Sequence, residues 1–166
     1  MRQKTESKIM ETLYENPTVK FTMRELTKKT GLPRATVHKY IQAIKKQKLI
    51  TEENSAEDSL FFKIKKIDFF VEKIVSCGLI EFLVNELNPS CIILFGSIRK
   101  GDSNLSSDID LFVESSSDKK INVEKYESKL RHKIELFVEK KISDLPEHLF
   151  NNVVNGIKIY GSFKVK

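Results

Sequence analysis

Two segments decide the fold of the second half of this chain: Leu94-Phe95-Gly96-Ser97 and, ten residues later, Ser107-Asp108-Ile109-Asp110-Leu111. The apolar run Cys91–Phe95 predicts a buried strand that ends in a Gly-Ser turn. Side chains alternate between the two faces of a strand. We therefore expect Asp108 and Asp110 to point the same way from a second strand, while the apolar residues between and after them pack behind.

Two neighbouring aspartates repel each other unless a cation sits between them. Mg²⁺ is the expected ion, because it prefers oxygen ligands and commonly uses one or two carboxylates together with substrate phosphates. A Gly-Ser turn that leads into a helix offers free backbone N–H groups and a positive dipole end to phosphate. The combination predicts a nucleoside triphosphate site.

The pairing of Gly96-Ser97 with Asp108-Ile109-Asp110 resembles the signature of the DNA polymerase β-like nucleotidyltransferase superfamily. More narrowly, residues 90–161 resemble the small minimal nucleotidyltransferase domains of archaea and bacteria. The resemblance implies transfer of a nucleoside monophosphate from a triphosphate, with ATP the first expectation, to an acceptor hydroxyl. It also implies a two-metal Mg²⁺ site that holds Asp108 and Asp110.

The superfamily usually carries a third carboxylate on another strand, in an apolar–acid–apolar setting. Ile134–Glu139 alternates as a strand, and Glu135 lies between two apolar residues in it. Glu135 is therefore the candidate for the third catalytic and metal-binding carboxylate. The alternative is a solvent-facing glutamate on an edge strand.

The loop after the Gly-Ser turn departs from the family pattern. Small members often read Gly-Ser-aromatic-Ala-Arg-Gly, and this chain reads Gly96-Ser97-Ile98-Arg99-Lys100-Gly101. We expect Gly96, Ser97, Arg99 and Lys100 to bind the nucleotide. Lys100 stands where arginine is usual and lacks the bidentate guanidinium fork, so Arg99 either compensates or faces solvent.

The positive charge of the chain is concentrated in its first third. The whole chain carries +6, whereas residues 1–66 hold 15 Lys/Arg against 8 Asp/Glu, or +7. Such a basic segment points to nucleic acid or another polyanion. A solvated lysine-rich surface is the alternative.

This basic third reads as helices followed by a hairpin. The expected helices cover residues 5–15, 22–29 and 33–48. Thr22 is a plausible N-cap with Glu25 as its capping-box partner, and Gly31 supplies the break. Residues 49–51 and 60–64 are expected to be strands around a polar turn, which adds a wing.

The segment resembles the winged helix-turn-helix family of DNA-binding domains. The helix from Pro33 would be the recognition helix. The resemblance assigns major-groove contacts to Arg34, His38, Lys39 and Gln42, and phosphate contacts to Lys45 and Lys46. The wing turn is acidic, with Glu52, Glu53, Glu57 and Asp58, which argues against a wing contact with the duplex. Use of the fold for dimerisation or protein contact alone is the alternative.

The expected fold class is α+β, with two domains. Residues 1–66 form a winged helix-turn-helix, and residues 67–166 form a small mixed-sheet nucleotidyltransferase domain with flanking helices, of which 67–89 is the connecting helix. Cys77 and Cys91 lie in apolar segments without metal-ligand spacing and read as buried free thiols. No apolar run approaches bilayer length, so we expect a cytoplasmic protein without membrane contact.

The functional expectation is an Mg²⁺-dependent nucleotidyltransferase with an attached DNA-binding winged helix. The alternatives are a nucleotide-sensing transcriptional regulator and an antitoxin-like protein with little or no transferase activity. A nucleoside triphosphate and DNA are the expected partners, and both a homodimer and a further protein partner are compatible with the sequence.

Overall fold

The computed structural model describes residues 2–164 and divides into two compact units. The N-terminal unit comprises residues 1–66 together with the short segment 103–105. The C-terminal unit comprises residues 67–102 and 106–166. Within the described range, no helix combines the length and the apolar character needed to cross a membrane.

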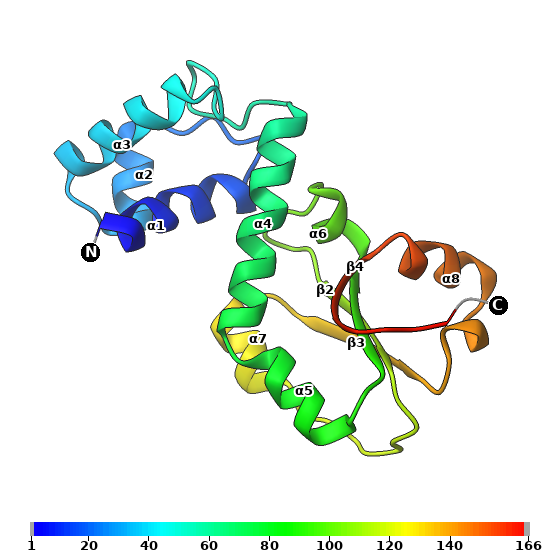
Figure 1. Ribbon diagram of the computed structural model, residues 1–166. Helices are drawn as coiled ribbons and strands as arrows, with labels where there is room; N and C mark the ends of the chain where they lie inside the picture. The colour runs from blue at the N-terminus through cyan, green and yellow to red at the C-terminus, as the bar shows by residue number, and fades with distance from the viewer. Residues whose placement is uncertain (1, 165–166) are drawn as a thin grey trace. The chain divides into compact units, whose positions relative to one another are not determined.

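The N-terminal unit is built on a helix-turn-helix. Its helices are α1 (Arg2–Glu15), α2 (Met23–Thr30), α3 (Arg34–Lys46) and the first turns of α4 (Leu60–Ser76) (Figure 1). The core between α1, α2 and α3 is made of fully buried aliphatic side chains: Ile9, Leu13, Leu26, Val37, Ile41 and Ile44. Those of α1 and of α3 recur at helical spacing, and α2 contributes Leu26, so burial of the apolar face of each helix explains the bundle.

The turn between α2 and α3 is specified locally. Thr22 caps α2, and Thr22 and Glu25 form the expected capping box. Gly31 ends α2 in the left-handed conformation, with φ 66°, which glycine adopts without the steric cost of a Cβ. Pro33 then stands directly before α3. The predicted helix boundaries in this unit are confirmed to within a few residues.

The predicted wing is only partly formed. A single β bridge joins Ile50 to Ala56, and residues 60–64, expected as the second wing strand, are instead the first turns of α4. That expectation was wrong for a physical reason. The Ser59 hydroxyl accepts a hydrogen bond from the Phe62 N–H and so caps the helix, and buried Phe62 and Phe70 extend its apolar stripe upstream.

Helix α4 and helix α5 (Leu79–Leu87) replace the expected connecting helix 67–89. Gly78, with φ 87°, lies between the two helices, so the expected single helix is broken at this glycine. The division between the two units falls inside α4, at Lys66 and Ile67.

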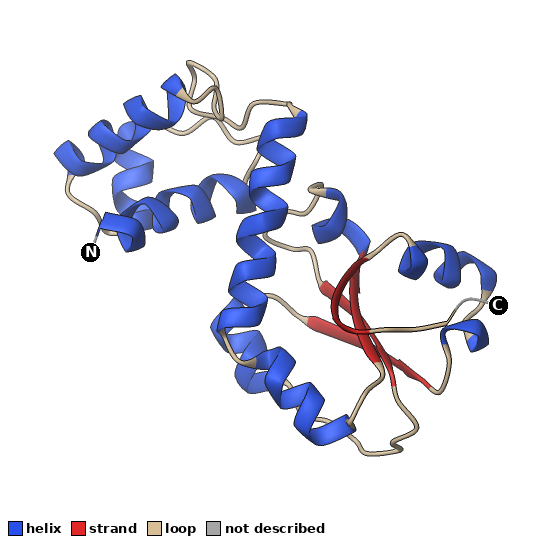
Figure 2. Cartoon of the chain, in the orientation of Figure 1, coloured by secondary structure: helices blue, strands red, loops and turns tan. Residues whose placement is uncertain are grey.

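The C-terminal unit is a four-stranded mixed sheet with helices on both faces (Figure 2). Its strands are β1 (Cys91–Phe95), β2 (Ile109–Glu114), β3 (Ile134–Glu139) and β4 (Ile157–Gly161), in the order β3-β2-β1-β4. β2 and β3 are parallel, and β1 is antiparallel to both β2 and β4. The remaining helices are α6 (Gly96–Lys100), α7 (Glu124–Leu130), the 3₁₀ helix η1 (Ile142–Asp144) and α8 (Glu147–Val154).

One face of the sheet packs against α8. Cys91, Ile93, Phe95 and Phe112 belong to the buried cluster on this face, together with Val153 of α8. In a sheet, residues directly opposite each other on adjacent strands share a face. This face therefore continues, at the end of β1 and the starts of β2 and β3, into the row of residues that forms the candidate site.

Candidate active site

Asp110 lies at the centre of a three-strand row. It is opposite Phe95, the last residue of β1, on one side and Glu135 of β3 on the other. All three side chains therefore project from the same face of the sheet. The parallel pairing of β2 with β3 is what brings two carboxylates from distant parts of the chain into adjacent positions.

The environment of Asp110 disfavours its charged form. Burial of the carboxyl group raises its pKa to about 6, and the carboxylates of Glu135 and Asp108 add to the rise. Asp108 immediately precedes β2 and is half-buried, whereas the Glu135 side chain is exposed. The three carboxylates predicted from the sequence are thus close enough to interact electrostatically.

Gly96 places the backbone against the Asp110 carboxyl group. A Cβ at position 96 would overlap Asp110 Oδ2, and the glycine has φ 71°. Only glycine meets both conditions without displacing its neighbour. The Gly-Ser turn and the Asp-x-Asp strand, separate motifs in the sequence, are therefore parts of one site.

The other nucleotide-binding candidates surround this turn with different exposure. Ser97 and Arg99 are half-buried and Lys100 is exposed, while buried Ile98 anchors the five-residue helix α6. The Ser97 carbonyl accepts a hydrogen bond from the Asp102 N–H. Of the side chains that the structure describes, neither Arg99 nor Lys100 is held in an ion pair. Both cations remain available to an anion.

His132 is a supporting residue that sequence reasoning missed. It is buried, and its Nδ1 lies 2.7 Å from the Ser107 carbonyl oxygen. A carbonyl can only accept, so Nδ1 carries the proton in this hydrogen bond. A backbone hydrogen bond from the Ile109 N–H to the Lys133 carbonyl joins the same two segments. Together they fix the backbone on both sides of Asp108, an arrangement that no local pattern signals.

The donor set suits a hard divalent cation. Asp108 and Asp110 offer carboxylate oxygens, and the pKa of Asp110 is raised first by burial and then by the carboxylates of Glu135 and Asp108. Between residues 2 and 164, no group of three or more His, Cys, Asp or Glu side chains is assembled to hold a metal ion. Mg²⁺ commonly takes only one or two carboxylates and completes its shell with water and phosphates. The two aspartates therefore fit Mg²⁺.

The exposed face of α3 carries most of the predicted DNA-contacting residues. Arg34, His38, Lys39, Gln42 and Lys46 are exposed. Lys45 differs, because its Nζ lies 2.5 Å from the Glu52 carbonyl oxygen and 3.1 Å from the Glu52 carboxylate. This ion pair and the one between Lys20 and Glu53 neutralise part of the acidic wing turn.

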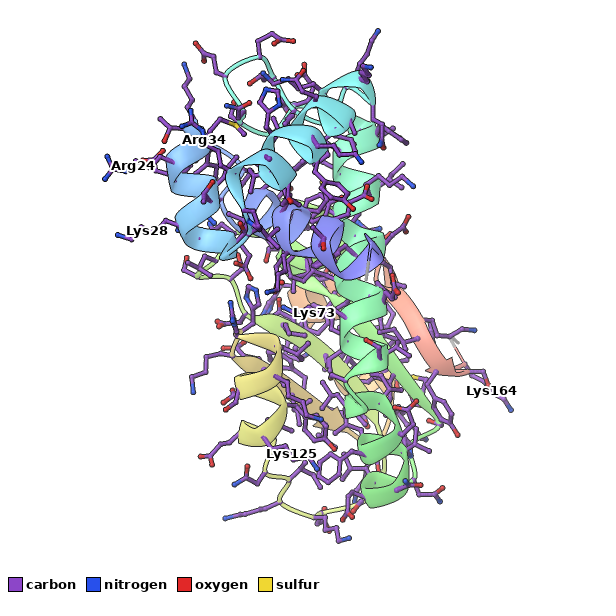
Figure 3. All side chains as sticks on the ribbon, turned by 90° about the vertical axis from the view of Figure 1, so that its left-hand side faces the viewer. Arg24, Lys28, Arg34, Lys73, Lys125 and Lys164 are labelled. Carbon is purple, nitrogen blue, oxygen red and sulfur yellow. The ribbon has the colours of Figure 1, made fainter. Side chains whose placement is uncertain are left out.

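Helix α2 also carries exposed basic residues, among them Arg24 and Lys28. Figure 3 shows Arg24 and Lys28 projecting from α2, and Arg34 projecting from the start of α3. Arg24 and Lys28 are exposed and one helical turn apart, so they share a face. Their spacing could have flagged them in the sequence, where only the third helix was considered for DNA contacts.

Comparison with known protein families accounts for both units. The model of the polymerase beta nucleotidyltransferase family matches residues 78–164, just over half of the chain. The MarR family model matches residues 4–59. No match was found among curated proteins or among solved structures. The chain joins a MarR-like helix-turn-helix to a nucleotidyltransferase domain, and it belongs to the polymerase beta nucleotidyltransferase family.

Proposed function

We propose that the protein transfers a nucleoside monophosphate from a nucleoside triphosphate, with ATP the first candidate, to an acceptor hydroxyl. The observation that carries the proposal is the position of Asp110, which packs against Gly96 and lies in register with Glu135. A scaffold has no evident need to gather two carboxylates around Asp110 that add to the rise that burial causes in its pKa. A nucleotide site has that need.

The residues of the site would have two roles, phosphate binding and metal binding. The backbone N–H groups of Gly96 and Ser97 and the Ser97 hydroxyl would hold the terminal phosphates, with Arg99 and Lys100 as neighbouring cations. Asp108 and Asp110 would hold Mg²⁺, with Glu135 as the third carboxylate of a second metal position. Bound there, Mg²⁺ supplies neutralisation of the phosphate charge and orientation of the reacting groups.

The reaction is a displacement at the α-phosphorus. The acceptor oxygen forms a bond to this atom, the bond to the β-phosphate bridging oxygen breaks, and pyrophosphate leaves. The exposed Glu135 carboxylate is the group best placed to accept the proton of an incoming hydroxyl, because it lies at the edge of the site. Most of the catalytic effect comes from positioning.

We also propose that the N-terminal unit binds DNA. The support is the exposed basic and polar face of α3, which includes Arg34, Lys39 and Lys46, together with the match of residues 4–59 to the MarR family. The first residues of such a helix reach base edges, and lysines near its end contact phosphates. Because Lys45 is paired with Glu52, it should contribute less to DNA binding than Lys46.

Nucleotide sensing without turnover is the second candidate function. It is favoured by one feature, Lys100 at the position where the family usually has arginine, because a lysine there lacks the bidentate guanidinium fork. A regulator of this kind would bind a triphosphate and DNA and release no pyrophosphate.

One experiment separates the two functions. The protein is incubated with Mg²⁺ and each of the four α-labelled ribonucleoside triphosphates, in the presence of DNA, RNA or protein preparations as acceptors. Transfer predicts labelled acceptor with the wild type and none with Asp110→Asn. Nucleotide binding without label in any acceptor would reject the transferase and leave the sensor.

DNA binding is tested by mobility shift at two salt concentrations. Phosphate contacts require the affinity to fall steeply as salt rises, because counterions are released on binding. A complex that forms at low salt and weakens strongly at high salt is expected. Absence of any shift with genomic fragments at low salt would reject the proposal.

A further inference from the structure

The segment 103–105 belongs to the N-terminal unit, although the rest of that unit ends at Lys66. Asp102 and Ser106, on either side of the segment, belong to the C-terminal unit. The loop that contains the segment leads from α6, which begins with the Gly-Ser turn, to Asp108 directly before β2. It therefore links the two motifs of the candidate active site through residues that fold with the other unit.

Two hydrogen bonds hold this segment in the N-terminal unit. The Lys66 ammonium group donates to the Ser103 carbonyl oxygen. The Leu105 N–H donates to the Glu15 carbonyl oxygen at 2.8 Å, at the end of α1, where the last carbonyls of a helix have no partner within it. Ser103 is fully buried, and Lys66 is 1% exposed. The segment is thus an integral part of the unit.

Lys66 is the side chain that distinguishes this arrangement from ordinary packing. Burial of an ammonium group is costly unless hydrogen bonds compensate for the lost water. An apolar side chain of similar volume would fill the same position of α4 without that cost. The neighbouring Lys65 is exposed, with its ammonium group 5.7 Å from the centre of the Phe61 ring. The bond to Ser103 gives the buried lysine a role that an apolar residue could not perform.

Both ends of the same loop are held within the C-terminal unit. The Asp102 N–H donates to the Ser97 carbonyl oxygen at 3.1 Å, and His132 Nδ1 donates to the Ser107 carbonyl oxygen at 2.7 Å. The loop is therefore fixed at its start and at its end by the unit that contains the candidate active site, and in its middle by the N-terminal unit.

We propose that Lys66 is a positioning residue of the nucleotide site. Its bond to Ser103 keeps the middle of the loop in place, so that the phosphate-binding turn and Asp108 are held together before the nucleotide binds. Without the bond, the loop has to be ordered when the nucleotide binds, and the cost of that ordering lowers the affinity. The inference rests on the proposed function and extends it, because it makes the N-terminal unit necessary for a complete site.

Calorimetric titration of the full chain with Mg²⁺ and each of the four ribonucleoside triphosphates tests this role in Lys66→Met. Methionine keeps a flexible unbranched side chain and removes the donor. We expect the dissociation constant of the bound triphosphate to rise about tenfold, since a few loop residues are then ordered only on binding. Without nucleotide, the backbone amides of residues 102–109 should exchange hydrogen faster than in the wild type. Lys66→Arg, which restores an N–H donor, should recover most of the affinity.

A second variant loosens the loop without altering a buried side chain. Asn104 is exposed, and Asn104→Gly adds backbone freedom within the segment. We expect it to weaken nucleotide binding about threefold, so the proposal can be judged even where Lys66→Met fails to fold.

Two controls separate positioning from a general loss of stability. Lys65→Met removes an exposed ammonium group from the adjacent position and should bind nucleotide as the wild type does. Val37→Ala removes both γ-methyl groups of a fully buried side chain in the core of the N-terminal unit. It should lower the unfolding temperature, followed by circular dichroism, without changing the nucleotide affinity.

The outcomes distinguish the role of Lys66 from the nucleotide site itself. Wild-type affinity in Lys66→Met, or equal weakening in Lys66→Met and Val37→Ala, would overturn the role of Lys66 and leave the nucleotide site standing. Unchanged hydrogen exchange over residues 102–109 of Lys66→Met would overturn it as well. No nucleotide binding by the wild type would reject the nucleotide site and, with it, the role of Lys66.

Discussion

The candidate active site and the exposed face of α3 use their side chains in opposite ways. Asp110 is half-buried, packed against Gly96 and perturbed by two neighbouring carboxylates. Lys39 and Lys46 on α3 are exposed on a helix surface. Chemistry at a phosphorus atom needs groups held by the backbone, whereas attraction to a polyanion tolerates mobile cations. The two regions should therefore respond differently to substitution.

The largest expected effect is the loss of transfer in Asp110→Asn. The substitution removes the charge of the carboxylate at nearly constant size. We expect the rate of nucleotidyl transfer to fall about a thousandfold, since one oxygen ligand and its charge are lost at the reacting phosphates. The measurement is incorporation of label from α-labelled triphosphate.

Asp118→Asn is the control for Asp110→Asn, because Asp118 is exposed in a loop of the same unit. It should retain the wild-type rate. Comparable rates in Asp110→Asn and the wild type would remove Asp110 from the chemistry.

The second effect concerns the close approach of the turn to Asp110. Gly96→Ala introduces a Cβ that overlaps Asp110 Oδ2, and we expect nucleotide affinity to fall about a hundredfold, or some 3 kcal/mol. Gly78→Ala is a matched control, because Gly78 also has a positive φ but has open space around its would-be Cβ. Both variants should lose about 1 kcal/mol of folding stability; equal nucleotide affinity in the two would contradict the account.

The third effect is the pH dependence of folding in the metal-free protein. The pKa of Asp110 is raised from 3.8 to about 6, so the folded state favours the protonated carboxyl group. Its stabilising contribution is complete below about pH 4 and is lost as pH rises through 6. At pH 7 with chelator, Asp110→Asn should be more stable than the wild type by about 1 kcal/mol, a figure discounted for partial exposure.

Urea unfolding at pH 4 and pH 7 measures this difference. The advantage of the variant should disappear at pH 4, where the wild-type carboxyl group is neutral as well. A stability difference that is the same at both pH values would show that the carboxylate charge is not its cause.

The smallest effect compares two neighbouring lysines on α3. Lys46→Ala should weaken DNA binding a few-fold and reduce the salt slope by about one unit. Lys45→Ala should change both less, because Lys45 is already paired with Glu52. Mobility shifts across a salt series measure both quantities. A larger effect for Lys45→Ala than for Lys46→Ala would contradict the greater role given to Lys46 in DNA binding.

Local signals predicted much of both units. The bounds of β1 and β3 were expected as Cys91–Phe95 and Ile134–Glu139 and are confirmed, because short apolar runs with alternation have few other outcomes. The Thr22 capping box is confirmed for a similar reason, since its partners lie three residues apart. The strand expected at 60–64 was wrong because helix periodicity further along α4 decided the conformation.

Non-local contacts could not be predicted. The overlap of position 96 with Asp110 depends on how β1 and β2 pair. The burial of Lys66, which donates to the Ser103 carbonyl within the N-terminal unit, is a second such contact. Both depend on residues more than ten positions apart, which no periodicity encodes.

The most direct test of the candidate active site is calorimetric titration of the wild type and Asp110→Asn with each of the four ribonucleoside triphosphates, with and without Mg²⁺. This measurement requires no knowledge of the acceptor. We predict Mg²⁺-dependent binding of at least one triphosphate by the wild type and its loss in the variant. Equal binding by the two proteins, or no binding by the wild type, would contradict a nucleotide site built on Asp108, Asp110 and the Gly96-Ser97 turn.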